Sequence, residues 1–210
     1  FQTDSTGKAT IACRLGYWNS PVAGKAWFDN IEITSKDFTD PIIGDNLYLL
    51  LEQGDVQSIG KKKVEEWLRH LDKAYVTYHE LVGTVPYNGE KIGIVSFRQN
   101  IGGFAVAGNP IRWKREYIKP ELQHIANEGD WSFGILHEIS HCFDTGMEKG
   151  KPGDRPWNFH SEFFANLKMY FVVSELNAAV IINGRKYKGA ELKEYYAQTA
   201  ENERKRNEYT

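Results

Sequence analysis

The sequence is poor in several features that define whole classes of protein. It has only two cysteines, Cys13 and Cys142, so it cannot be built on a disulfide framework, and we expect two free, buried thiols. No uninterrupted apolar run is long enough to span a membrane. The formal net charge is only −2, which provides no broad basic field. We therefore expect neither nucleic acid nor an anionic membrane surface as the main partner.

The composition indicates a folded protein. The 210 residues are 41% hydrophobic and 26% charged, which is enough to bury a core in one or two compact domains. The chain begins at Phe1, with neither an initiator methionine nor a signal-like segment. We expect it to be processed, or excised from a longer protein.

A change in composition near residue 35 predicts two parts. Residues 1–34 are expected to form a β segment with strands at 9–15 and 25–33, separated by turn residues. Residues 35–210 are expected to form an α+β domain. Its predicted strands are 47–51, 91–97 and 103–113, the last of them interrupted at 108–110 by Gly, Asn and Pro. Its predicted helices are 62–82, 130–143, 160–177 and 188–207. Gly83 follows the first of these helices and is expected to end it.

The run His-Glu-Ile-Ser-His at residues 137–141 carries the strongest chemical signal. On a helix, His137 and His141 lie one turn apart on the same face and can bind one zinc ion. Glu138 lies next to them and can accept a proton from a water that the zinc activates. The alternative is an ordinary helix with two surface or structural histidines.

The surrounding sequence fits this motif. Asp130 is a candidate N-cap, followed by apolar residues at helical spacing. Gly134 lies one turn before the motif, where it either leaves room on the metal face or allows close helix packing.

A catalytic zinc site needs a third protein ligand. Residues 144–147 lack the glycine and histidine of the metzincin pattern. We predict Glu162, near the start of the next helix, as the third ligand. Asn166 lies one turn further on, where its amide can hold a ligating histidine in place. The alternatives for the third ligand are His160, Asp144 and Glu148.

Two histidines followed by a glutamate from a later helix resemble the ligand set of the gluzincins. Within that group, the spacing of Glu162 from His141 and the glycine-containing segment 102–111 resemble the enhancin-like, mucin-directed metallopeptidases. The resemblance covers roughly residues 40–180. It implies a zincin-like fold, one zinc ion, and hydrolysis of peptide bonds in glycoproteins such as mucins by a secreted or cell-surface enzyme.

The resemblance also implies an edge strand that holds an extended peptide by main-chain pairing. Gly103, Phe104 and Ala105 are the candidates for this role, and a plain core strand is the alternative. No histidine follows His160, so we expect no downstream histidine to stabilise the oxyanion. The candidate tyrosines for that task are Tyr187, Tyr195 and Tyr196.

Residues 26–33 resemble the last strand of carbohydrate-binding jelly-roll modules. Trp18 and Trp27 are candidates for glycan contact, with a core position as the alternative for Trp27. The sequence therefore predicts a zinc endopeptidase with a peptide or glycoprotein substrate and a possible glycan contact. The alternative is a glycan-binding or adhesion module with a structural or vestigial zinc site.

Overall fold

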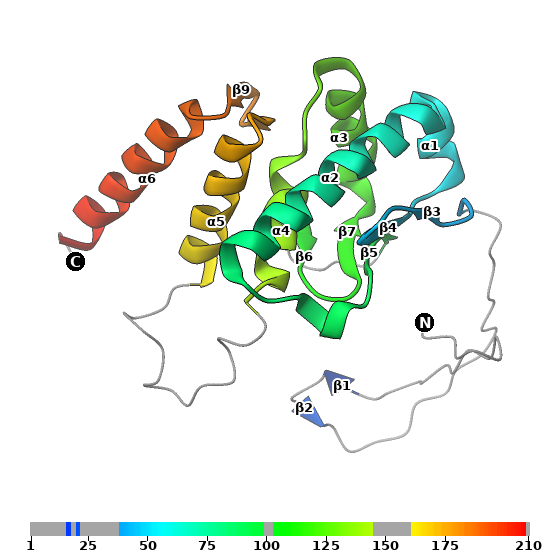
Figure 1. Cartoon of the computed structure of the whole chain (residues 1–210), viewed down its shortest axis with the longest axis horizontal. Helices are drawn as coiled ribbons and strands as arrows, with labels where there is room; N and C mark the ends of the chain where they lie inside the picture. The colour runs from blue at the N-terminus through cyan, green and yellow to red at the C-terminus, as the bar shows by residue number, and fades with distance from the viewer. Residues whose placement is uncertain (1–15, 18–19, 22–37, 99–102, 145–160, 209–210) are drawn as a thin grey trace. The chain divides into compact units, whose positions relative to one another are not determined.

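The computed structural model describes residues 16–17, 20–21, 38–98, 103–144 and 161–208 (Figure 1). The chain divides into two compact units, Phe1–Lys36 and Asp37–Thr210. In the first unit, β1 (Gly16–Tyr17) pairs antiparallel with β2 (Ser20–Pro21). The strands expected at 9–15 and 25–33 lie outside the described residues, as do Cys13, Trp18 and Trp27.

The second unit is built around a mixed five-stranded sheet. Its strand order is β3 (Ile42–Ile43), β4 (Leu47–Leu50), β5 (Ile92–Phe97), β7 (Ile111–Lys114) and β6 (Ala105–Val106). The three central strands are parallel and the outer two are antiparallel to their neighbours. The central strands are rich in Leu, Ile and Val, as is typical of strands with both faces covered. Along the described chain, β6 has a sheet neighbour on one side only.

Helices cover the sheet and carry the candidate site. They are α1 (Gln53–Ile59), α2 (Lys61–Val82), α3 (Arg115–Glu128), α4 (Phe133–Cys142), α5 (Ser161–Glu175) and α6 (Glu191–Glu208). A short helical turn spans Pro86–Gly89, and a hairpin of β8 (Ala179–Ile182) and β9 (Arg185–Lys188) lies between α5 and α6. The prediction of an α+β fold with a mixed sheet is confirmed.

Helix α2 packs against α4, the helix that carries the His-Glu-Ile-Ser-His motif. Its apolar stripe is buried against the sheet and against α4, and Trp67 and Leu71 are almost fully covered. Two polar tips on the same helix reach the backbone of the next layer. The Trp67 indole N–H donates to the Trp131 carbonyl at 3.1 Å, and the Tyr78 hydroxyl donates to the Leu136 carbonyl at 3.0 Å. The backbone of α4 is therefore fixed at both its entry and its middle.

The structure corrects the predicted start of α4. Ser132, not Asp130, is the N-cap, and its hydroxyl accepts from the Ile135 N–H. Asp130 Oδ1 instead accepts from the Ser132 N–H at 3.0 Å and from the Ile181 N–H at 3.1 Å. Asp130 therefore fastens the entry of α4 to the β8–β9 hairpin.

Other boundaries also differ from the sequence prediction. The segment 103–113 forms two strands joined by a turn, and the start of the helix expected at 188–207 belongs to β9. Helices α1 and α3 and the β8–β9 hairpin were not predicted. Gly83 does end α2, in a left-handed conformation with φ of 76°.

Candidate metal centre

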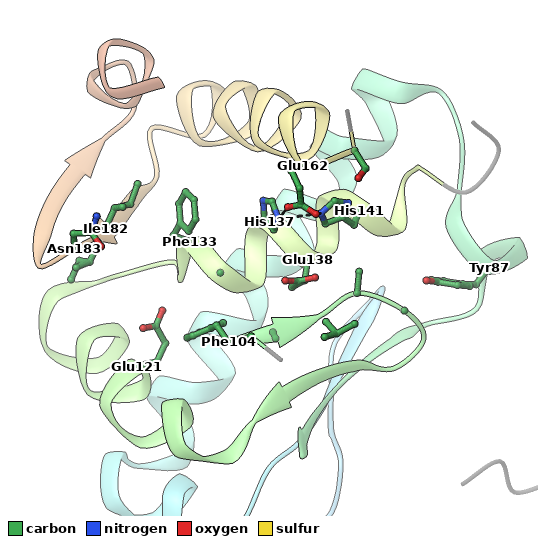
Figure 2. Close-up of a pocket in the computed structure, with 18 residues that line it drawn as sticks. Tyr87, Phe104, Glu121, Phe133, His137, Glu138, His141, Glu162, Ile182 and Asn183 are labelled. Carbon is green, nitrogen blue, oxygen red and sulfur yellow. Dashed lines mark hydrogen bonds and ion pairs between the residues drawn. The ribbon is translucent and has the colours of Figure 1, made fainter. Parts of the chain in front are cut away.

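Two helices bring three ligand groups together. His137 and His141 lie one turn apart on α4, with their Nε2 atoms 3.0 Å apart. Glu162 comes from the first turn of α5, and its carboxylate lies 3.0 Å from His137 Nε2 and 3.4 Å from His141 Nε2 (Figure 2). These are the groups predicted as ligands. Among the described residues, this is the group of histidine, cysteine and acidic side chains that could hold a metal ion.

The other nitrogen of each ring is occupied by an acceptor. His137 Nδ1 lies 2.8 Å from Asn166 Oδ1, and His141 Nδ1 lies 3.2 Å from Asp144 Oδ2. Because a carbonyl or carboxylate oxygen only accepts, each Nδ1 carries the proton and donates. Each Nε2 then keeps a lone pair that points into the group. Asn166 lies where the sequence predicted it, and Asp144 orients a histidine without belonging to the ligand group.

The donor set fits zinc. Two imidazole nitrogens and a carboxylate oxygen are typical ligands of catalytic zinc, and zinc–nitrogen bonds of about 2.0–2.1 Å place tetrahedral ligand atoms roughly 3.3 Å apart. The distances here are 3.0, 3.0 and 3.4 Å. Three groups that present lone pairs to one another repel unless a proton or a metal ion lies between them, so the arrangement is compatible with a bound cation. Glu162 is 60% exposed, so the group is open to solvent on that side.

A buried ion pair lies behind His141. Lys168, on α5, donates to the Ser140 carbonyl at 2.9 Å and contacts Asp144 Oδ1. Lys168 and Asp144 are 8% and 2% exposed. The hydrogen bond with Asp144 raises the pKa of His141. This pair joins α4 to α5, and no pattern in the sequence predicted a role for Lys168.

Glu138 points away from the ligand group, toward β6 (Figure 2). Its carboxylate accepts a hydrogen bond from the backbone of Ala107, and burial raises its pKa. The base candidate is therefore held between α4 and the edge strand, next to the ligands.

A cleft of about 1060 Å³ runs past these residues. The chain from Gly103 to Gly108 forms one wall, and α4 forms the other. Gly103, Phe104 and Ala105, the predicted substrate-binding residues, all line the cleft. Tyr87 lies at one end, and Glu121, Ile182 and Asn183 lie at the other (Figure 2).

Gly134 is required by close packing. A Cβ atom at this position would lie 2.5 Å from the Phe104 ring, far inside van der Waals contact. The glycine therefore lets the aromatic ring of the cleft wall lie directly on α4. Of the two interpretations of Gly134, the structure favours close packing.

The tyrosines expected to stabilise an oxyanion lie elsewhere. None of Tyr187, Tyr195 and Tyr196 is among the described residues that line the cleft. The Tyr196 hydroxyl instead donates to Asn166 Oδ1 at 3.4 Å, so it supports the residue that orients His137. Tyr87 does line the cleft, and it was missed because it lies 50 residues before His137 in the sequence and only the fold brings it to the cleft. His160 and Glu148 lie outside the described residues. Cys142 is buried, and its Sγ lies 3.3 Å from the Glu138 carbonyl oxygen.

In the part of the chain that the structure describes, no helix combines the length and apolar character that crossing a membrane needs.

The chain matches no protein-family model and no curated protein. Its fold is similar to that of a functionally unknown conserved protein from Bacillus anthracis str. Ames, with a TM-score of 0.50 and 14% sequence identity. A mutant of such a protein from the same organism matches with a TM-score of 0.49 and 15% identity. Each match covers 67% of this chain and 29% of the other, so this chain spans less than a third of those proteins.

Proposed function

We propose that the chain is a zinc-dependent endopeptidase with a zincin-like fold and a gluzincin ligand set. In this proposal His137, His141 and Glu162 hold one zinc ion, and Glu138 is the general base. The observation that carries it is the convergence of three lone-pair donors beside a half-buried carboxylate. They lie in a cleft bordered by the edge of β6 that has no neighbour among the described strands.

Each residue has a defined task in this reaction. Zinc, when bound, supplies Lewis-acid polarisation of the attacking water and of the peptide carbonyl. Glu138 accepts the proton of the attacking water and then delivers it to the nitrogen of the leaving amine. The Ala107 backbone holds the Glu138 carboxylate in one position during both transfers. Asn166 and Asp144 keep the two imidazoles in the tautomer that leaves Nε2 available.

The substrate is proposed to be an extended peptide. Strand β6 has one sheet neighbour among the described strands, so the backbone groups on its other edge can pair with a peptide strand. Main-chain pairing along Gly103, Phe104 and Ala105 recognises any extended sequence. Specificity must then come from side-chain pockets along the cleft.

Glycoproteins such as mucins are the proposed substrate class, and a secreted or cell-surface location goes with it. Both rest on the resemblance of the motif, its spacing and the segment 102–111 to the mucin-directed metallopeptidases. The alternative of a glycan-binding module rests on residues 26–33, which lie outside the described part of the chain.

Two substitutions test the mechanism. Glu138→Gln keeps the ligand set, so we expect stoichiometric zinc but no cleavage of a mucin-type glycopeptide or of casein. Glu162→Ala removes a ligand, so we expect loss of zinc. Metal content is measured by mass spectrometry after dialysis, and cleavage by fragment mass analysis. Glu175→Gln, at an exposed position of α5, is the matched control. An active Glu138→Gln protein would contradict the mechanism.

A further inference from the structure

We propose that Glu121 forms a subsite for a positively charged group of the substrate, either a lysine or arginine side chain or the peptide's terminal ammonium. This inference rests on the proposed function, because it assigns a specificity to the same cleft. No sequence motif pointed to Glu121, which lies on the unpredicted helix α3.

Glu121 lines the cleft at some distance along it from the metal ligands. Its side chain reaches toward Phe104 and Phe133, at the end of the cleft opposite Tyr87 (Figure 2). A peptide paired with β6 would therefore contact the ligand group and Glu121 at different positions along its length. The carboxylate is placed to meet a side chain or chain end, not the reacting bond.

A second carboxylate lies behind Glu121. Asp130 is 2% exposed, and its Oδ1 holds two backbone N–H groups, as described above. Its Oδ2 is buried and receives no hydrogen bond from the described residues. The Asp130 carboxyl lies within hydrogen-bond distance of that of Glu121, and a hydrogen bond between them needs a proton on one of the two. Among the described residues, the Ser132 hydroxyl donates to Glu121.

The pair lacks a fixed positive partner. Among the described residues, no lysine or arginine interacts with Glu121 or Asp130, and His124 is the one cationic group that acts on both. His124 is already paired with Glu128 at 2.6 Å. Burial raises the pKa of both carboxyl groups, and the charge of Glu121 also raises the pKa of Asp130, to about 7. The pair therefore needs a proton, and a substrate cation in the cleft can take its place.

The walls of the subsite suit a long cationic side chain. The aromatic rings of Phe104 and Phe133 flank the approach to Glu121 (Figure 2). Such rings cover the methylene stem of a lysine or arginine and also attract its charge. The combination of apolar walls and an acidic end distinguishes a basic side chain from an equally long neutral one.

The test compares lysine with norleucine, which has a similar stem without the charge. Blocked hexapeptides, acetylated and amidated, carry one lysine at each position in turn, each with a norleucine twin. Unblocked neutral hexapeptides test the terminal ammonium separately. Binding is measured by calorimetry to the zinc-loaded Glu138→Gln protein, and cleavage by the wild-type protein. We expect about tenfold tighter binding of the cationic peptide at one position, as for a single charge-assisted hydrogen bond.

Glu121→Gln, made in the same background, is expected to reduce this ratio to about one. Glu121→Leu is the second variant, and zinc content and melting temperature show whether each protein is folded. Glu116→Gln removes a charge from an exposed position of the same helix outside the cleft and should keep the ratio. The subsite is overturned if the lysine and norleucine peptides bind equally or if neither binds. It is also overturned if the preference for lysine persists in Glu121→Gln. Preferential binding without cleavage overturns only the peptidase proposal.

Discussion

Lys168 and His141 hold opposite oxygens of one buried carboxylate. Lys168 contacts Asp144 Oδ1, and His141 Nδ1 lies 3.2 Å from Asp144 Oδ2. A charge on α5 thereby fixes the orientation of the His141 ring on α4, which belongs to the group that could hold a metal ion. The same two helices supply the ligand group, so its geometry depends on how they pack.

Lys168→Met should leave Asp144 buried without its cation. We expect a loss of about 3 kcal/mol in the free energy of unfolding, because removal of one partner strands the other charge. Zinc affinity should fall about tenfold or more as His141 loses its fixed orientation. Urea unfolding and chelator competition measure these two quantities. Lys193→Met, at an exposed position, is the control, and wild-type stability in Lys168→Met would contradict the prediction.

Asn166→Leu should weaken zinc binding while the ligands remain. The substitution removes the acceptor of His137 Nδ1, so the ring can turn or change tautomer, and we expect an affinity loss of about 10- to 100-fold. Asn166→Asp keeps an acceptor oxygen at this position and should retain most of the affinity. Chelator competition distinguishes the two variants, and equal affinities would rule out this role for Asn166.

Gly134→Ala should force Phe104 off α4. The new methyl group would lie 2.5 Å from the ring, so we expect a loss of about 1–3 kcal/mol in the free energy of unfolding. Gly54→Ala is the control, because a Cβ there meets nothing within 4 Å and the residue is helical. That substitution should stabilise the protein by about 0.4–1 kcal/mol. If both substitutions have the same effect, the close contact is not the reason for Gly134.

Asp130→Asn should change how stability depends on pH. The folded protein raises the pKa of Asp130 from 3.8 to about 7, so the folded state binds a proton that the unfolded state releases between these values. Stability contributed by this group is therefore present below about pH 4 and is lost as the pH rises through about 7. Asparagine keeps Oδ1 as the acceptor of the Ser132 N–H. It replaces Oδ2, a buried oxygen to which no described residue donates, with an uncharged amide group.

We expect Asp130→Asn to raise the melting temperature at pH 8 and to change it little at pH 5. Calorimetric scans at the two pH values measure the difference. Asp45→Asn, at an exposed position outside this cluster, serves as control. An equal effect at both pH values would show that the charge of Asp130 does not oppose folding.

The parts of the site that follow from local spacing could be predicted from sequence. His137 and His141 meet because four residues make one helical turn, and the same rule places Asn166 one turn after Glu162. The helix 62–82 has a long apolar stripe, and the structure reproduces it to within a residue at its start. Glu162 needed more, because residues 142–161 separate it from the histidines. It was predicted from the need for a third ligand and from its place near the start of the next expected helix.

The parts that depend on packing could not be predicted. Helix α3 has a weaker apolar stripe and contains Pro120, so its pattern did not indicate a helix, and Glu121 was missed with it. Lys168 was missed because a lysine in a helix is normally exposed, and only the packing of α5 on α4 buries it. Asp130 was taken for a helix cap because the hairpin that it also holds is remote in sequence.

The open edge of β6 also limits how this chain can associate with itself. A strand with free backbone groups is a template for any other extended chain, including a second copy of the same protein, and long flat edges lead to aggregation. Here the regular strand is only two residues long, Gly103 and Gly108 lie close to its ends, and the body of α4 faces it across the cleft. The space between β6 and α4 therefore suits one extended peptide strand. The edge strand of a second folded sheet cannot reach β6, because the rest of its sheet would collide with α4.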